Sequence, residues 1–352
     1  MSEWKTYRLG DLCSRIKSGK GIPASEVFTT GEYPVIGGNG IRGYANTSNF
    51  NGVCAVVGRQ GAYCGNVRFF SGEAYMTEHA VVIVGNELAD TRYLAYLLSI
   101  MQLGHLSAQS AQPGLSVQTL SKLSINIPDI STQRRIAGIL GSLDDKIELN
   151  RRINANLEAQ AQALFRSWFV NNETIDLQYY ELGDVATINA GGDKPTVYSK
   201  DLTEQCCIPI YSNGIDNEGL YGYTNSAKIN TTSITISARG TIGYICLRTK
   251  PYVPIVRLIS VVPNKSELSA EFLYLWALTQ NISGTGTTQQ QLTVPDFRKT
   301  SIGLPPEETL KRFNDVIIPI FQKIDTNKNE NKTLSALRDT LLPKLMTGEI
   351  KI

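Results

Sequence analysis

Metal ligands with a recognisable spacing are missing from this sequence of 352 residues. The chain has only two histidines, His79 and His105, and none of its cysteines stands in a CxxC pair. Structural zinc sites need such spacing, so we expect no metal site. We interpret the cysteines as reduced residues of the core or of strands. They are Cys13, Cys54, Cys64, Cys206, Cys207 and Cys246.

Motifs that bind nucleotides or activate a nucleophile are missing as well. No segment fits the GxxxxGK[ST] phosphate loop, and none resembles the Asn-Pro-Pro-Tyr segment of an amino-methyltransferase. Gly38-Asn-Gly-Ile-Arg-Gly43 fits GxGxxG, but a turn-rich segment follows where a dinucleotide site needs a helix. Gly58-Arg-Gln-Gly61 lacks the nucleophile of a GxSxG elbow. We therefore expect no catalysis by this chain alone and no cofactor of its own.

Long apolar runs and a secretory signal are also lacking. No run approaches the roughly 20 apolar residues that span a membrane. The segment Met1–Tyr7 has no apolar stretch of the kind that a signal peptide carries. The sequence thus predicts a cytosolic protein without membrane contact.

Net charge is only +2, with 34 basic and 32 acidic residues. This balance argues weakly against a general nucleic-acid binder. Two stretches, residues 33–72 and 219–266, contain no acidic residue and interleave tyrosines with basic side chains. They predict two local surfaces for an anionic ligand. Their basic residues are Arg42, Arg59 and Arg68 in the first stretch, and Lys228, Arg239, Arg248, Lys250, Arg257 and Lys265 in the second.

The most informative feature is an internal repeat of roughly 175 residues. Leu9-Gly-Asp11 returns as Leu182-Gly-Asp184, and Leu123–Pro128 is matched by Thr300–Pro305. A looser match relates Val57–Gly61 to Ser237–Gly240 and predicts that Arg59 and Arg239 hold matching places. Each copy begins with short strand-like runs and turn residues, followed by one helical stretch, at Thr91–Leu98 and Ala270–Ala277. The sequence therefore predicts two α/β domains within an α+β chain.

Each copy ends in a long helix with a heptad seam. Adding 177 to a seam position of the first helix gives the matching position of the second, and Arg338 alone is out of character. Matched helices within one chain, with a domain between them, predict an antiparallel coiled coil. The predicted segments are domain 1 (1–130), a central helix (131–172), domain 2 (173–305) and a C-terminal helix (306–352). The seam residues are Ile136, Leu140, Leu143, Ile147, Asn150, Asn154, Leu157 and Leu164, and then Phe313, Ile317, Ile320, Ile324, Asn327, Asn331, Leu334 and Leu341.

The helical motifs resemble one known family. Pro128-Asp-Ile-Ser-Thr-Gln-Arg-Arg-Ile136, Asp144-Asp-Lys-Ile-Glu-Leu-Asn150 and the ending Leu341–Ile350 are similar to segments of specificity subunits of type I restriction–modification enzymes. Leu310 departs from the pattern, because the first copy has Gln133 there. The resemblance implies two target-recognition domains joined by an antiparallel coiled coil, each domain reading half of a split sequence in double-stranded DNA. It also implies docking of two modification subunits, with S-adenosylmethionine, ATP and magnesium bound only by those and the restriction subunits.

Candidate DNA-reading residues lie in the glycine-rich and basic stretches of both domains, because base reading needs bidentate side chains and close backbone approach. Two glutamine-rich segments, Gln109–Gly114 and Thr287–Gln291, are further candidates. The alternatives are a self-sufficient DNA methyltransferase or nuclease, and a coiled-coil scaffold whose two lobes bind carbohydrate or protein. The candidates are Gly38, Asn39, Gly40, Arg42, Tyr44, Arg59, Gln60 and Tyr63 in domain 1, and Ser212, Asn213, Gly214, Tyr223, Arg239 and Thr241 in domain 2.

If stiff paired helices space the two domains, the recognised sequence has two short unlike parts and a spacer of one length. Adding one base pair to the spacer moves one half-site by about 3.4 Å and rotates it by about 35°. We expect methylation to fall sharply on such a target, measured by incorporation of labelled methyl groups into oligonucleotides. Equal methylation over spacers that differ by several base pairs would mean that the helices are a flexible tether.

Overall fold

The computed structural model describes residues 4–107, 114–282 and 291–352. The chain forms two compact units. Unit 1 comprises Met1–Leu149 with Glu330–Ile352, and unit 2 comprises Asn150–Asn329. The units divide each long helix between them, whereas the sequence-based segmentation treats each helix as a segment of its own. The segment boundaries stay a prediction.

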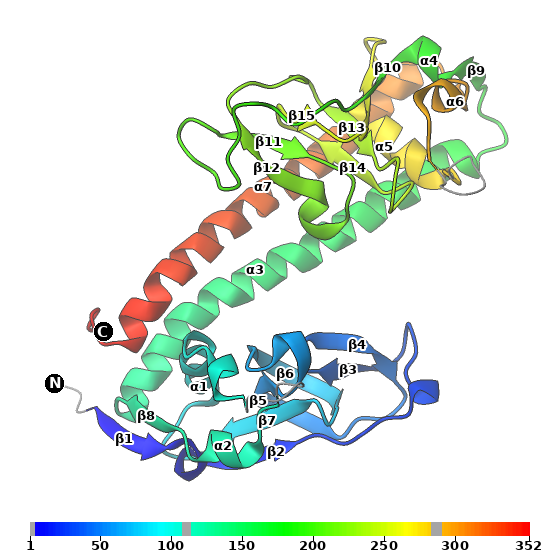
Figure 1. Ribbon diagram of the computed structural model, residues 1–352. Coiled ribbons are helices and arrows are strands. Elements are labelled where there is room, and N and C mark those ends of the chain that lie inside the picture. The colour runs from blue at the N-terminus through cyan, green and yellow to red at the C-terminus, as the bar shows by residue number, and fades with distance from the viewer. Residues whose placement is uncertain (1–3, 108–113, 283–290) are drawn as a thin grey trace. The chain divides into compact units, whose positions relative to one another are not determined.

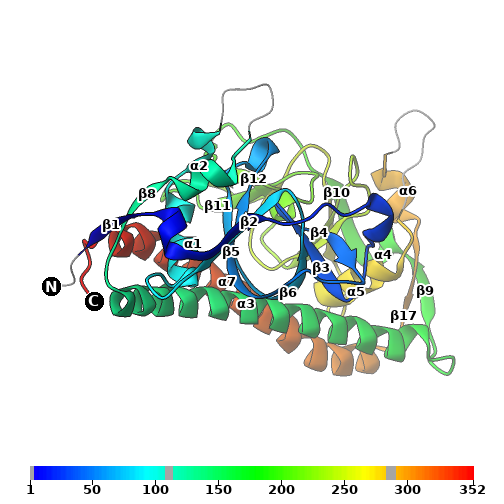
Figure 2. The ribbon, with the colours of Figure 1, turned by 90° about the horizontal axis from the view of Figure 1, so that it is seen from below.

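Unit 1 is built on a six-stranded sheet with the order β2-β7-β5-β6-β3-β4 (Figure 1). Neighbouring strands are antiparallel except for β3 and β6, which run parallel. A separate pair, β1 and β8, joins the start of the domain to its end (Figure 2). The strands are β1 (Lys5–Arg8), β2 (Cys13–Ser18), β3 (Tyr33–Gly37), β4 (Gly40–Ala45), β5 (Phe50–Gly58), β6 (Val67–Met76), β7 (Ala80–Gly85) and β8 (Ser124–Ile127).

Alternating side chains of β5 supply both faces of this sheet. Ala55 and Val57 pack on one face against helix α1 (Thr91–Ile100), and Cys54 and Val56 belong to a second cluster on the other face. This period of two is what a strand covered on both faces requires. Asp90 caps α1 by accepting from the N–H of Tyr93, and Ser116 caps α2 (Val117–Ser121) in the same way.

Unit 2 repeats this plan, but its sheet is split in two. The four-stranded part has the order β10-β16-β13-β14 and the three-stranded part the order β12-β11-β15. The single strand β6 of unit 1 corresponds to the separate strands β14 and β15, and Pro251 lies in the gap between them. Proline cannot donate a ladder hydrogen bond, so the sheet breaks there. The strands are β9 (Gln178–Glu181), β10 (Ala186–Ala190), β11 (Ile208–Tyr211), β12 (Leu220–Thr224), β13 (Ser233–Ile236), β14 (Ile245–Arg248), β15 (Val253–Pro254), β16 (Ile259–Pro263) and β17 (Ser301–Leu304).

The helices of unit 2 occupy the same places in the repeat. Helix α5 (Ala270–Thr279) covers the sheet as α1 does, and Ser269 caps it. Thr293 caps α6 (Val294–Arg298), matching Ser116 at α2 after a shift of 177 residues. A short helix, α4 (Leu182–Val185), precedes β10. The predicted helical stretches, strand-like runs and tandem α/β domains are thus confirmed.

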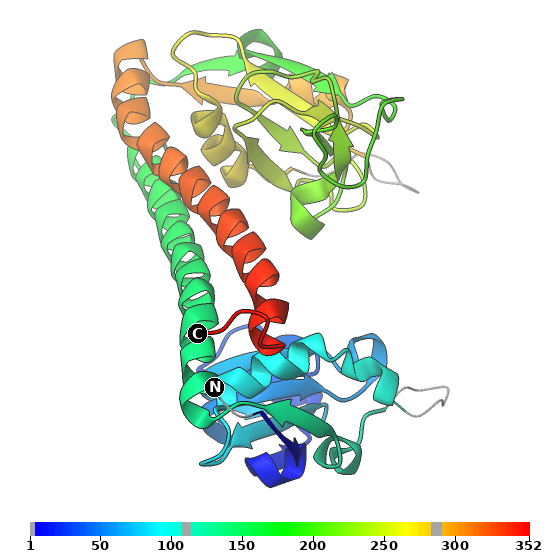
Figure 3. The same cartoon turned by 90° about the vertical axis from the view of Figure 1, so that its left-hand side faces the viewer.

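The two long helices are α3 (Ile130–Phe165), which ends in a π-helical turn at Arg166–Val170, and α7 (Glu307–Met346). A part of α3 lies beside a part of α7 in each unit (Figure 3). In unit 1, Lys146 pairs with Glu330 and Asp144 with Arg338, so the numbering falls along one helix as it rises along the other. In unit 2, Asn154 meets Asn327 while Phe165 contacts Phe313. The predicted antiparallel pairing is therefore confirmed.

Every predicted seam residue is buried or half-buried. The seam does more than join the helices, because its ends belong to the domain cores. Ile136 and Leu140 pack with the α1 core of unit 1, and Phe313 and Ile317 pack with the α5 core of unit 2. Each long helix is thus anchored at its start in the domain that precedes it.

Several polar side chains of the seam bond across the two helices. The amide of Asn327, only 1% exposed, donates to Asn154 over 2.8 Å, and Asn154 donates to the carbonyl of Ile324. Arg338, out of character in the heptads, bonds Asp144 over 2.8 Å, and Asp144 also accepts from the Tyr96 hydroxyl. A buried polar pair costs little only while both partners are present.

The cysteines do not form disulfides: Cys54, Cys206 and Cys246 are buried, and Cys207 is exposed. Burial raises the pKa of the Cys13 and Cys54 thiols to about 12, so both are protonated at neutral pH. Among the described residues, no three metal-ligating side chains gather in a possible metal site. None of the described helices is long and apolar enough to cross a membrane.

Replacing Asn154 with alanine leaves the Asn327 amide buried without this acceptor. We expect a loss of about 1–3 kcal/mol in the free energy of unfolding, measured by urea denaturation followed by circular dichroism. Asn156→Ala on the exposed face of the same helix is the matched control. Equal stability of the two variants would show that the Asn154–Asn327 bond contributes nothing.

Candidate nucleic-acid interface

In unit 1, three loops and the segment that leads into α2 meet at one end of the sheet. The N–H of Arg59, after β5, donates to the carbonyl of His79, between β6 and β7, over 3.0 Å. The carbonyl of Arg59 accepts from the N–H of Leu115, before α2, over 2.9 Å. A Cβ on Gly38, between β3 and β4, would lie 3.2 Å from both Gly58 Cα and the oxygen of the His79 carbonyl, so a side chain there would crowd the neighbouring loops.

This loop cluster contains most of the predicted residues of domain 1. Gly38 and Asn39 form its β3–β4 turn, and Gly40 follows with φ +104. Arg59 and Gln60 begin the next loop, and Tyr63, 52% exposed, lies in its 3-10 turn, Gly61–Tyr63. Arg42 points back along the hairpin, since a Cβ at Gly37 would meet its Cδ at 2.7 Å. The structure thus brings together Gly38, Asn39, Gly40, Arg42, Arg59 and Gln60, with Tyr63 on the rim.

Tyr44 and its counterpart Tyr223 lie elsewhere. Tyr44 exchanges backbone hydrogen bonds with Phe28, and Tyr223 does so with Ser199. Tyr44 is four residues along β4 from Gly40, which is about 13 Å of strand. The two tyrosines occupy matching places in the repeat, away from the loops.

Unit 2 builds the same loop cluster with different side chains. The N–H of Ile255 donates to the carbonyl of Tyr211, as that of Thr77 does to Ile36. The N–H of Leu258 donates to Ile255, as that of Ala80 does to Thr77. These bonds make loop Ile255–Leu258 the counterpart of loop Thr77–Ala80.

The same comparison corrects the pairing of Arg59 with Arg239. Leu115 donates to the Arg59 carbonyl, but its counterpart Leu292 donates to the Ala238 carbonyl. Arg239 therefore matches Gln60, one residue further on. The loop of unit 1 is also one residue longer, because Gly58 bonds Asn66 where Ser237 bonds Tyr244. Letter-by-letter matching over this length difference misaligned the two arginines.

Some of the predicted residues of domain 2 hold loops together, and others lie on the surface. Asn213 accepts from the N–H of Ala238 over 2.8 Å and donates to the carbonyl of Val256 over 2.6 Å, so its side chain ties two loops together. Ser212 bonds Gly219 through its backbone, and Gly214 follows Asn213 in the same loop. Arg239 is exposed and donates to Gln291 over 3.0 Å. Thr241 is half-buried and its carbonyl accepts from the N–H of Tyr244.

The acid-free stretch of domain 2 overstates the basic surface. Arg248 is 4% exposed, stacks on Tyr211 at 3.6 Å and donates to Thr235 and to the carbonyl of Glu218. Lys265 lies over the ring of Tyr180, and Lys250 donates to Asn329. Arg239 and Arg257 are the exposed arginines at the loop cluster of this unit.

Sequence reasoning missed the loop Thr77–Ala80 and its counterpart. His79 is not among the residues predicted from the sequence, yet it lies in the cluster, and its side chain lies 3.1 Å from that of Glu78. The two loops share no residues that align by eye, so the repeat could not reveal them. Of the glutamine-rich candidates, residues 109–113 and 287–290 lie outside the described residues; Gln60 forms a β-bridge with Gly114.

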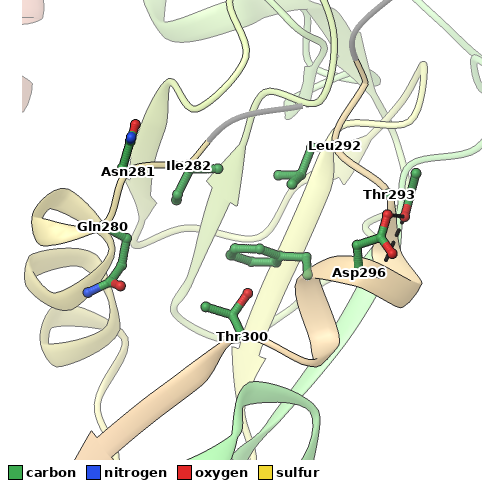
Figure 4. Close-up of a pocket in the computed structure, with 8 residues that line it drawn as sticks. Gln280, Asn281, Ile282, Leu292, Thr293, Asp296 and Thr300 are labelled. Atoms are coloured by element: carbon green, nitrogen blue, oxygen red, sulfur yellow. Dashed lines mark hydrogen bonds between the residues drawn. The ribbon is translucent and has the colours of Figure 1, made fainter. Parts of the chain in front are cut away.

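A cavity of about 200 Å³ in unit 2 adjoins α6 (Figure 4). Leu292 and Phe297 give it apolar walls, while Thr293 donates to Asp296 over 2.6 Å and caps the helix. A second cavity of about 380 Å³ is lined by Gly191, Arg257 and Gln291 among others. The polar side chains Thr293 and Asp296 at the first cavity are used to cap α6, and the second cavity lies at the loop cluster.

Comparison with known proteins places this architecture in a family. The sequence profile described as the type I restriction modification DNA specificity domain matches residues 1–159 and 174–338. The specificity subunit of the type I restriction enzyme HindI of Haemophilus influenzae is 29% identical over 329 residues, covering 68% of this chain and 71% of that one. That of EcoprrI from Escherichia coli is 38% identical over 146 residues, covering 40% and 36%.

A solved structure agrees in fold. The S subunit of a type I restriction–modification system from M. genitalium superimposes with a TM-score of 0.66 at 18% identity, covering 98% of this chain and 96% of that one. The chain belongs to the family of type I restriction modification DNA specificity domains.

Replacing a buried arginine of unit 2 should lower the stability of the protein, whereas replacing an exposed arginine should not. Arg248→Ala removes the stacking on Tyr211 and two hydrogen bonds, so we expect a loss of about 2–3 kcal/mol in the free energy of unfolding. Arg239→Ala and Lys250→Ala, both exposed, should stay within about 0.5 kcal/mol of the parent chain. Urea denaturation measures all three. A comparable loss for Arg239→Ala would place that side chain in the fold rather than on the surface.

Proposed function

We propose that this chain is the sequence-recognition subunit of a type I restriction–modification complex and that each unit reads one half of a split DNA target. The observation that carries the proposal is the pair of loop clusters, built by matching backbone hydrogen bonds and bearing unlike side chains. Arg59, Gln60 and His79 in unit 1 correspond to Ala238, Arg239 and Arg257 in unit 2. One scaffold with two sets of side chains suits a target whose halves differ.

The chemistry of the clusters supports DNA as the ligand. Arginine, asparagine and glutamine are the side chains that bond base edges in two places, and all three occur in the cluster of unit 1. Only a few exposed basic groups belong to either cluster, and the net charge is +2. Phosphate neutralisation dominates DNA affinity, so the isolated chain binds DNA weakly and relies on its partners for affinity.

Partners dock, in this proposal, on the exposed faces of the paired helices. The helices repeat in sequence, so they offer two similar surfaces for two copies of one modification subunit. The modification subunits supply S-adenosylmethionine and the chemistry of adenine methylation, and restriction subunits supply ATP and magnesium. The recognition subunit itself is non-catalytic and works in the cytosol. In this proposal the paired helices link the two reading units.

Reconstitution with the modification subunit tests this function. We expect methylation of one split sequence, two modification subunits per chain by native mass spectrometry, and no turnover of DNA, ATP or S-adenosylmethionine by the chain alone. The matched control is the modification subunit without this chain, which should methylate no defined sequence. Methyl transfer by the purified chain alone, or methylation independent of DNA sequence, would contradict the proposal.

A further inference from the structure

The loop Ile255–Leu258 of unit 2 contains two consecutive residues in the left-handed backbone region. Val256 has φ +52 and Arg257 has φ +61. This region is unfavourable for any residue with a Cβ and most of all for a β-branched one such as valine. Such strain persists only where the surroundings hold it in place, and it concentrates at ligand-binding sites.

Three hydrogen bonds hold the two strained residues of this loop. The N–H groups of Val256 and Arg257 donate to the carbonyls of Gly192 and Gly191 over 2.9 and 2.8 Å. The carbonyl of Val256 accepts from the side chain of Asn213 over 2.6 Å. A Cβ at Gly191 would lie 2.6 Å from the carbonyl carbon of Pro254, so only glycine allows this approach. The bonds use both N–H groups and the carbonyl of Val256, and the side chains of the two residues project outward.

The projecting side chains are Val256, 51% exposed, and Arg257, also exposed. Arg257 borders the cavity of about 380 Å³, whose lining includes Gln291 and Thr293 and no acidic residue. Gln291 in turn accepts from Arg239. The strained loop thus places a guanidinium at the edge of a hollow with mainly apolar walls, where the side chain of Gln291 also bonds a second arginine, Arg239.

The geometry points to Arg257 as the specificity-determining residue of unit 2, bonding O6 and N7 of a guanine through its two parallel N–H groups. This assignment rests on the proposed function. It specifies the base contact by which unit 2 would recognise its half of the target. A phosphate contact needs only a positive charge on a flexible stem. A rigid, strained backbone is suited instead to a bidentate contact, because two hydrogen bonds to one base edge need a defined direction.

The matching loop of unit 1 presents different chemistry at the same place. His79 corresponds to Arg257 and Glu78 to Val256, and the side chains of Glu78 and His79 lie 3.1 Å apart. Neither Glu78 nor His79 has a positive φ. The guanine contact therefore belongs to one half-sequence alone.

The test uses the chain assembled with its modification subunit and oligonucleotides in which each base pair of the target is changed in turn. Arg257→Gln should lower the preference for one G·C pair in one half-sequence by about 5- to 150-fold and leave the other half unchanged. Val256→Gly relieves the strain, so it should preserve or raise the melting temperature while weakening the same preference. Lys299→Gln removes the same charge from an exposed position of this unit and should change nothing.

Three results would overturn the assignment. A loss equal for all sequences, with the salt dependence of binding reduced by about one phosphate, would make Arg257 a backbone contact. Unchanged base preferences in Arg257→Gln would remove it from the interface. A large fall in melting temperature would make it a structural residue. Failure of the proposed function would be detected separately and first, because the complex with the unsubstituted chain would then recognise no split sequence.

Discussion

The recognition surface depends on backbone hydrogen bonds between loops. In both units, a residue shortly after strand β5 or β13 accepts a hydrogen bond from Leu115 or Leu292, which lies just before helix α2 or α6. Because main-chain groups make these bonds, they do not require a particular side chain at Arg59 or Ala238. A cluster held this way keeps its shape while its outward side chains differ. That property is what lets one repeated scaffold present Glu78-His79 in one unit and Val256-Arg257 in the other.

The two units also fix the long helices with different side chains at matching places. Gln133 is fully buried and bonds Asp90, Leu88 and Pro128, which fastens the start of α3 to domain 1. At the matching place Leu310 is apolar, and Asn314 bonds Ser269 and Glu267 instead. The charged pair Asp144–Arg338 of unit 1 corresponds to Phe321 and Ala161 in unit 2, after the shift of 177 residues. The first junction thus uses polar side chains at different positions in the two units, whereas the second is a charged pair in unit 1 and apolar packing in unit 2.

The periodic sequence patterns predicted the helices, their pairing and the domains, but not how side chains point within loops. The heptads identified both long helices and their antiparallel pairing, and the repeat identified two α/β domains. Side-chain direction within loops was out of reach, because no period describes it. Arg248 looked like surface charge but is buried on Tyr211, and Asn213 looked like a DNA contact but ties two loops together. The loop containing Arg257 left no trace in the sequence, since its strained backbone depends on glycines about 65 residues earlier.

Each loop cluster has few exposed basic side chains. In unit 2 this follows from the contacts that its other basic residues make within the domain. A recognition surface that carried many basic groups would hold any DNA through its phosphates and would gain affinity at every sequence equally. Here Arg248 is used inside the domain and Lys250 and Lys265 contact Asn329 and Tyr180, which leaves Arg239 and Arg257 to face outward. Under the proposed function, a unit with so few exposed cations would discriminate mainly through base edges, and most of the affinity for DNA would come from the partner subunits.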